Sequence, residues 1–176
     1  VLVDQKYDAR LIGNIGNPVL SEKKINKKTV FVIEASSYQL DYSKVFTSKY
    51  AVILNISPDH LERHKNLKNY VNAKFKLLTS QPSKSIAFVK KNDPLINEII
   101  NKKNFKQKII KVDSLKNDKM LKQLKNKYFL SFGNKENLSF ILKISKTLKL
   151  SNKDLFKTLN KFKGLKYRQQ IIYENK

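Results

Sequence analysis

The chain has 176 residues and a formal net charge of +23, from 37 Lys and Arg against 14 Asp and Glu. Hydrophobic residues make up 40% of it and aromatic residues 10%, a content that excludes a disordered tail and predicts a folded interior. No cysteine is present, which excludes disulfides and thiolate metal sites and fits the reducing cytoplasm, where we expect the protein. The longest apolar runs are too short to span a membrane.

The positive charge could attract nucleic acid or an anionic membrane surface. However, the lysines are spread over the whole chain and often stand beside asparagine, as at Lys65-Asn66 and Lys68-Asn69. They do not form one dense stripe with interleaved aromatic residues. We therefore interpret the charge as a general Lys/Asn bias and expect no nucleic-acid partner. A polyanionic small substrate, such as a nucleotide, would still gain from the positive field.

The first half of the chain alternates short apolar runs with polar turns. Residues 9–12 predict a strand that ends at a turn with two glycines. Residues 30–33 and 51–56 are apolar runs without alternation, as expected of strands buried on both faces. The stretch between them, residues 38–46, is more polar and is expected to be helical or irregular.

The second half continues the alternation of helices and strands. Apolar residues spaced through residues 67–78 predict an amphipathic helix. The elements expected after it are a strand at 85–89, a helix at 95–102 opened by Asp93-Pro94, strands at 109–112 and 128–132, helices at 137–148 and 152–162 with Ser151 as N-cap of the second, and a strand at 169–173. Such alternation indicates an α/β fold with a mostly parallel sheet flanked by helices.

Polar clusters follow three of the predicted strands. They are residues 13–16 (Gly-Asn-Ile-Gly), 34–39 (Glu-Ala-Ser-Ser-Tyr-Gln) and 55–60 (Asn-Ile-Ser-Pro-Asp-His). Ligands of open parallel sheets bind beyond the carboxyl ends of the strands, so these clusters can converge on one site. The first cluster is not a P-loop, because no Gly-Lys-Ser/Thr follows it.

Individual side chains in these clusters have two interpretations each. Glu34 ends an apolar strand and needs a cation, a metal or water, but it could also be a surface or salt-bridged glutamate. His60, beside Asp59 in a strand-exit loop, suits a metal ligand or an acid–base group, or a structural role. Mg²⁺ would favour the oxygens of Glu34 and Asp59. Lys74 has many lysine neighbours and by itself indicates only solvated surface.

Six motifs in order resemble those of the Mur ligase family. They lie at residues 13–18, 34–40, 55–64, 70–74, 134–137 and 162–168, so the resemblance extends from about residue 10 to about residue 170. The Glu-x-Ser-Ser-aromatic-Gln form at residues 34–39 is closest to members that add D-glutamate. Three alternatives remain open: a different amino-acid adder, a folate-type polyglutamate synthetase, and a non-enzymatic basic α/β module that binds nucleic acid.

The resemblance implies an ATP-dependent amide-forming ligase of peptidoglycan synthesis. ATP would phosphorylate the carboxylate of UDP-N-acetylmuramoyl-L-alanine, and the amine of D-glutamate would attack the acyl phosphate. By the same resemblance, Glu34 and His60 would hold Mg²⁺, and Lys74 would be carbamylated and help to position that metal, which makes these three the catalytic set. The implied ligand contacts are Asn14, Ser36 and Gln39 to the UDP substrate, and Asn134, Asn137 and Arg168 to the nucleotide.

The resemblance also implies how the chain is organised. Residues 1–163 would be part of the central ATP-binding domain, and residues 164–176 the hinge and first strand of a C-terminal domain. The family's Gly-x-x-Gly-Lys-Ser/Thr loop is expected upstream of residue 1, and Gly133 stands where the family usually has histidine. The chain begins with neither an initiator methionine nor a signal-peptide pattern, so we expect it to begin inside a longer protein. Because the resemblance places the phosphate loop and parts of the other domains outside the chain, we expect the chain alone to be inactive. We also expect it to be monomeric.

Overall fold

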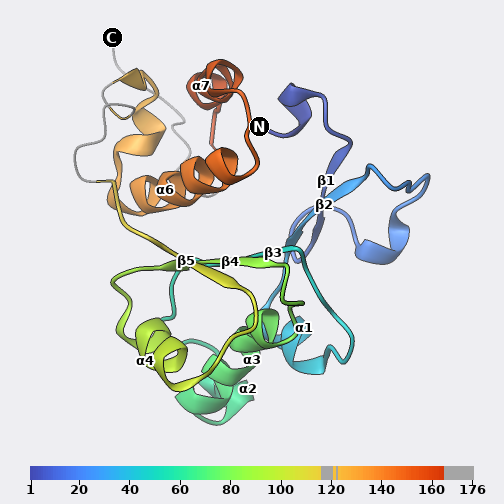
Figure 1. Ribbon diagram of the computed structural model, residues 1–176, viewed down its shortest axis with the longest axis vertical. Coiled ribbons are helices and arrows are strands. Elements are labelled where there is room, and N and C mark those ends of the chain that lie inside the picture. Colours follow the sequence, from blue (N-terminus) through green and yellow to red (C-terminus); the bar gives the residue numbers. More distant parts are fainter. Residues whose placement is uncertain (116–120, 122, 165–176) are drawn as a thin grey trace. The chain divides into compact units, whose positions relative to one another are not determined.

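The computed structural model describes residues 1–115, 121 and 123–164 (Figure 1). Two compact units divide the described chain: Asp8–Val112 form one, and residues 1–7 with the described residues from 113 onward form the other. Parallel sheets flanked by helices confirm the predicted α/β class. The predicted boundary at residue 163 stays a prediction.

A three-stranded parallel sheet organises the Asp8–Val112 unit. Its order is β3 (Tyr50–Ile53), β4 (Ile86–Lys90) and β5 (Lys108–Val112). The register places Ala51 opposite Ala87 and Ala87 opposite Ile109. β-branched and aromatic residues dominate β4, and its three central residues are fully buried, as the apolar run predicts.

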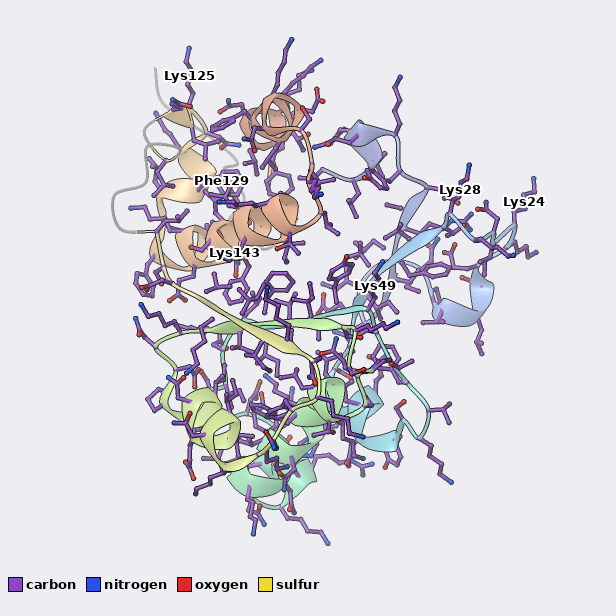
Figure 2. All side chains as sticks on the ribbon, in the orientation of Figure 1. Lys24, Lys28, Lys49, Lys125, Phe129 and Lys143 are labelled. Atoms are coloured by element: carbon purple, nitrogen blue, oxygen red, sulfur yellow. The ribbon has the colours of Figure 1, made fainter. Side chains whose placement is uncertain are left out.

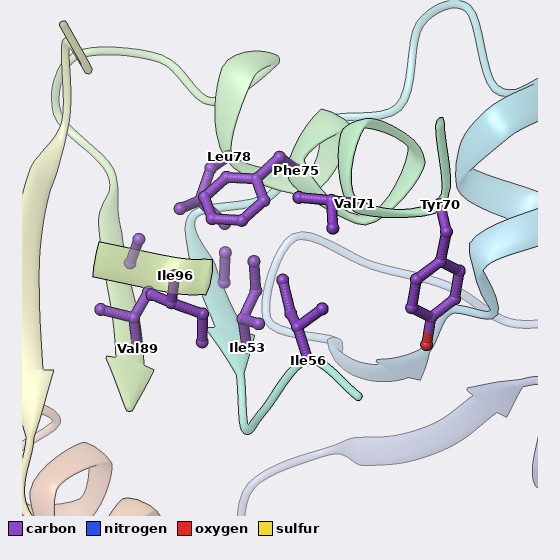
Figure 3. Packing of buried hydrophobic residues seen from close by; sticks show 10 residues of the cluster. Ile53, Ile56, Tyr70, Val71, Phe75, Leu78, Val89 and Ile96 are labelled. Atoms are coloured by element: carbon purple, nitrogen blue, oxygen red, sulfur yellow. The ribbon is translucent and has the colours of Figure 1, made fainter. Parts of the chain in front are cut away.

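Helices α3 (Leu67–Thr79) and α4 (Pro94–Lys102) supply the other half of this core. Asn66 and Asp93 cap them, each accepting a hydrogen bond from the backbone N–H three residues on. Figure 3 shows Phe75 and Leu78 of α3 together with residues of the sheet and α4. The cluster consists of Ala51, Ile53, Ile56, Tyr70, Val71, Phe75, Leu78, Ala87, Val89 and Ile96. The predicted helix at 67–78 is confirmed within one residue.

A separate parallel pair, β1 (Ala9–Gly13) and β2 (Val30–Glu34), precedes this sheet in the chain. The prediction that residues 30–33 are buried on both faces is wrong. Val32 is 46% exposed and Ile33 39%, because β1 is the one strand paired with β2 among the described residues. The run of apolar residues specified a strand correctly, but not how many neighbours it has.

Two short helices follow β2 and β3. After β2 comes α1 (Ser37–Tyr42), which packs against α3, and after β3 comes the single turn α2 (Leu61–His64). The predicted helical or irregular stretch at 38–46 thus begins as a helix and ends irregularly. A 3₁₀ turn, η2 (Val19–Ser21), lies between β1 and β2.

The second unit consists of helices. It contains 3₁₀ turns η1 (Val3–Gln5) and η3 (Lys127–Leu130) and helices α6 (Phe132–Thr147) and α7 (Asn152–Lys161). Ser151 caps α7 as predicted, with its hydroxyl accepting a hydrogen bond from Asp154 N. The buried core of this second unit consists of Leu124, Phe129, Leu138, Leu155 and Leu159.

Two predictions for this unit need correction. The expected strand at 128–132 is instead η3 and the start of α6, which begins at Phe132 rather than residue 137. Asn126 explains the difference: its Oδ1 accepts from Tyr128 N, while its Nδ2 donates to the carbonyls of Leu159 and Phe162. These bonds hold the apolar run as a turn against the end of α7. The expected strand at 169–173 lies outside the described residues.

Lysine side chains are distributed over both units. Figure 2 labels Lys24 and Lys28 between β1 and β2, Lys49 before β3, and Lys125 and Lys143 in the other unit. This spread agrees with a general lysine bias rather than one basic stripe. No described helix combines the length and apolarity that a membrane span requires.

Candidate functional site

The end of β2 carries the first predicted pair of site residues. Asn14 Nδ2 donates to Glu34 Oε1 at 3.2 Å, and Asn14 N donates to the Glu34 carbonyl at 2.8 Å. Gly13 makes this approach possible: its φ is +105°, and a Cβ there would lie 2.5 Å from the Glu34 carbonyl oxygen. Both side chains are exposed, so the second carboxylate oxygen of Glu34 remains open to solvent.

Ser36 and Gln39 form a capping box at the start of α1. Ser36 Oγ accepts from Gln39 N at 3.2 Å, and Gln39 Oε1 accepts from Ser36 N at 2.9 Å. The box occupies acceptor atoms of both side chains. It leaves the Ser36 hydroxyl proton and the Gln39 amide N–H groups as donors, and such donors can hydrogen-bond to an anionic ligand.

His60 stands in the loop after β3, with left-handed backbone angles of φ 53° and ψ 32°. Its Nε2 lies 3.5 Å from Asp59 Oδ2 and its Nδ1 3.9 Å from Glu62 Oε1. The imidazole is thus flanked by two carboxylates, and it is exposed to solvent. Within the described residues, no group of three or more His, Cys, Asp or Glu side chains could by itself hold a metal ion.

A series of rings leads from His60 to Lys74. The Tyr38 ring centroid lies 5.0 Å from that of His60 and 5.5 Å from that of His64, and the second pair is stacked at 10°. His64 meets Tyr70 edge-on at 5.5 Å, and Lys74 Nζ lies 4.8 Å from the Tyr70 centroid in a cation–π contact. We call Tyr38, His64 and Tyr70 the ring series.

Desolvation of the half-buried Tyr38 raises the pKa of its phenol, and the carboxylates of Glu62 and Asp59 act in the same direction. The phenol therefore stays protonated near neutral pH. The hydroxyl end of Tyr38 presents no negative charge to the loop that carries His60.

The predicted nucleotide residues lie in the other unit. Asn134 is buried in the first turn of α6, where its Nδ2 donates to the Tyr128 carbonyl at 2.8 Å. Asn137, one turn further along α6, is exposed. Arg168 lies outside the described residues. The Asn134 bond is a structural one, and Asn137 is the more accessible of the two amides.

The structure brings some predicted residues together and not others. Asn14 is bonded to Glu34, Ser36 to Gln39, and His60 is linked to Lys74 through rings. The described contacts do not include a direct one from Glu34 to His60 or Lys74. The metal set of Glu34, His60 and Lys74 stays a prediction.

Sequence reasoning missed the ring series. Tyr70 and Lys74 are four residues apart on a helix, and that spacing alone predicts their contact. The stacking of His64 on Tyr38 joins α2 to α1 and has no such local signal. It depends on how the helices pack.

Comparison with known proteins decides the family. A profile of the Mur ligase middle domain matches residues 10–163. The chain belongs to the Mur ligase family. Two similar proteins are UDP-N-acetylmuramoylalanine–D-glutamate ligases. The Rickettsia bellii protein is 31% identical over 98% of this chain and 42% of its own length. The Clostridioides difficile protein is 28% identical over 95% and 41%.

This Mur ligase chain therefore spans about two fifths of the length of these relatives. Its fold also matches a solved structure, that of the MurF ligase of Thermotoga maritima in complex with ADP. The TM-score is 0.66, with 14% sequence identity over 93% of this chain and 44% of the other. At that identity the likeness concerns the fold, and it agrees with the α/β class predicted from the sequence.

Proposed function

We propose that this Mur ligase middle domain is the ATP-handling part of a ligase that adds D-glutamate to UDP-N-acetylmuramoyl-L-alanine in peptidoglycan synthesis. The observation that carries the proposal is the continuous set of contacts from His60 through the ring series to Lys74, in the same unit as the Asn14–Glu34 pair. The similar proteins named as D-glutamate ligases support this substrate over that of another amino-acid adder.

The reaction joins two anionic substrates. The γ-phosphoryl group of ATP moves to the alanyl carboxylate, and the D-glutamate amine then displaces phosphate from the acyl phosphate to form the amide. The protein must neutralise charge on the moving phosphoryl group and hold the partners in line. Donors left free by the capping box, Gln39 Nε2 and the Ser36 hydroxyl, together with Asn14, would contact the UDP substrate.

The residues present fit a divalent cation in part. Glu34 has a carboxylate oxygen open to solvent, the kind of ligand that Mg²⁺ prefers, and His60 is an exposed imidazole beside two carboxylates. Bound Mg²⁺ would neutralise charge on the phosphoryl group. Lys74 as an ammonium repels such an ion, so the proposal requires carbamylation, in which the neutral amine adds to CO₂ and releases a proton to leave an anionic carbamate.

The nucleotide would be held by the second unit. Asn137 is exposed on α6 and can donate to a purine ring. The family resemblance also implies a nucleotide contact for Asn134, which is buried and donates to the Tyr128 carbonyl. Arg168, outside the described residues, would also contact the nucleotide. These three assignments extend the family membership to individual residues and stand as part of the proposal.

An NMR titration tests whether Glu34 and His60 bind the same divalent cation. The chain has two histidines, so its imidazole NMR spectrum contains two sets of signals, and His64→Phe assigns them. Paramagnetic Mn²⁺, used in place of Mg²⁺, should broaden the His60 signals first. Glu34→Gln should raise the Mn²⁺ concentration needed by about tenfold or more, since the loss of even an outer-shell partner lowers metal affinity by about 10–100-fold.

Glu98→Gln is the matched control, because Glu98 is an exposed carboxylate of α4 paired with Lys102. It should leave the titration unchanged. Equal broadening of both histidines, or the same titration in Glu34→Gln as in the unaltered chain, would contradict the shared site. Independently, the reading frame upstream of Val1 should encode a Gly-x-x-Gly-Lys-Ser/Thr loop, and a frame without one would contradict the ligase.

A further inference from the structure

His64 occupies the centre of the ring series. Its side chain is 5% exposed at the end of α2, and its Nε2 lies 3.0 Å from Ser37 Oγ in a buried hydrogen bond. Its backbone is also tied, since Asn69 Nδ2 donates to the His64 carbonyl at 3.0 Å. The residue is therefore fixed by its side chain and its main chain.

The imidazole of His64 joins three helices. Ser37 and Tyr38 belong to α1, His64 itself to α2, and Tyr70 to α3. The His64 ring stacks on Tyr38 and makes a T-shaped contact with Tyr70. A buried polar ring costs free energy unless it is hydrogen-bonded, and the equally buried Ser37 supplies that bond. The pair fixes the ring's orientation as well as its place.

The two outer contacts of the ring series reach the proposed catalytic residues. Tyr38 contacts His60, whose other described side-chain contacts are with its chain neighbours Asp59 and Glu62. Tyr70 contacts Lys74, four residues further along α3. A displacement of the His64 ring would therefore change the positions of both the His60 and the Lys74 side chains.

We propose that His64 is a positioning residue that holds Tyr38 and Tyr70, and through them His60 and Lys74, in the arrangement that the ligase site requires. The proposal rests on the proposed function for the roles of His60 and Lys74. His64 is buried, so its role in this proposal is exerted through its neighbours. Reactive groups must be held within a fraction of an ångström, and supporting residues locked by packing and hydrogen bonds achieve this.

The test compares three variants at one fixed pH. His64→Ala removes both stacking and the Ser37 bond, His64→Phe keeps a ring, and Leu78→Ala is the control, a buried truncation elsewhere on α3. The first readout is the His60 imidazole spectrum, which the nearby Tyr38 ring displaces from that of free histidine. We expect His64→Ala to move the His60 signals toward free histidine, His64→Phe to restore most of the displacement, and Leu78→Ala to leave it unchanged.

The second readout is the Mn²⁺ titration of His60. His64→Ala should raise the Mn²⁺ concentration for half-maximal broadening about tenfold, as when a residue that supports a metal ligand is removed. Unchanged His60 signals in His64→Ala, or equal changes in Leu78→Ala, would overturn the positioning role. A chain whose His60 signals respond to His64→Ala but never to Mn²⁺ would support the ring contacts and overturn the proposed metal site instead.

Discussion

The sheet β3–β4–β5 and the pair β1–β2 are built from similar residues but bury them to different extents. Ala87, Phe88 and Val89 of β4 are fully buried, whereas Val32 and Ile33 of β2 are substantially exposed. Each strand is an apolar run of about the same length. The number of neighbouring elements, and not the run itself, determines how much of a strand is removed from water.

This difference extends to the candidate site. Lys74 lies between Ala73 and Phe75, two fully buried residues of α3, so its backbone is fixed by the main core. Glu34 ends the exposed strand β2 and is held by the side chain and backbone of Asn14. The site therefore combines a residue anchored by packing with one anchored by hydrogen bonds.

The largest expected loss of stability follows a substitution in the well-packed core around β3–β4–β5. Phe75→Ala should lower the free energy of unfolding by about 3–5 kcal/mol, because it removes a fully buried ring from the main core. Val32→Ala should cost about 1 kcal/mol or less, since the side chain is half-exposed. Urea unfolding followed by circular dichroism measures both. Equal losses would mean that β2 is as well packed as the core.

A smaller effect tests the turn that holds β1–β2 together. Gly16 has φ +88°, and a Cβ there would lie 2.3 Å from the Leu11 carbonyl oxygen, so Gly16→Ala should cost about 1–3 kcal/mol. Gly133→Ala is the matched control, because nothing lies within 4 Å of its Cβ position in the first turn of α6. It should be neutral or stabilising by up to about 1 kcal/mol. Thermal unfolding of the two variants would show whether this asymmetry holds.

Local patterns predicted the elements well and their surroundings less well. The spacing from Leu67 to Leu78 and the caps at Asp93 and Ser151 are local signals, and the structure contains the helices they predict. The run at residues 128–132 has strand-like composition, but Asn126 bonds it to the end of α7, more than thirty positions away. No local pattern contains that information.

The candidate site follows the same division. The Asn14–Glu34 pair follows from the parallel order of β1 and β2, which places both strand ends at one edge. The stacking of His64 between Tyr38 and Tyr70 follows from the packing of three helices and needed the coordinates. The sequence named the candidate groups, which stay a prediction, whereas tertiary packing determines which side chains surround them.

The smallest expected effect on stability concerns Arg10, whose polar contacts connect β1 to the loop before β2. Its Nε donates to Asp8 Oδ1 at 3.1 Å, its Nη1 to Glu22 Oε2 at 2.9 Å, and both Nη atoms to the carbonyls of Lys23 and Lys24. The hydrogen bonds from Arg10 lower the pKa of Asp8, with help from Thr29, and that of Glu22, with help from Asn17. Their ionised forms are thus favoured in the folded chain.

A carboxyl group whose pKa is lowered by folding stabilises the fold above its unfolded pKa, near 4, and loses that contribution as pH falls through the folded value. Arg10→Met should therefore lower stability at pH 7 and reduce the difference in stability between pH 7 and about pH 3. Lys102→Met, which breaks the exposed pair with Glu98 on α4, should change stability little. A flat response to Arg10→Met across this range would mean that β1–β2, like the main sheet, depends on its apolar contacts, and the contrast between the two sheets would then be one of degree.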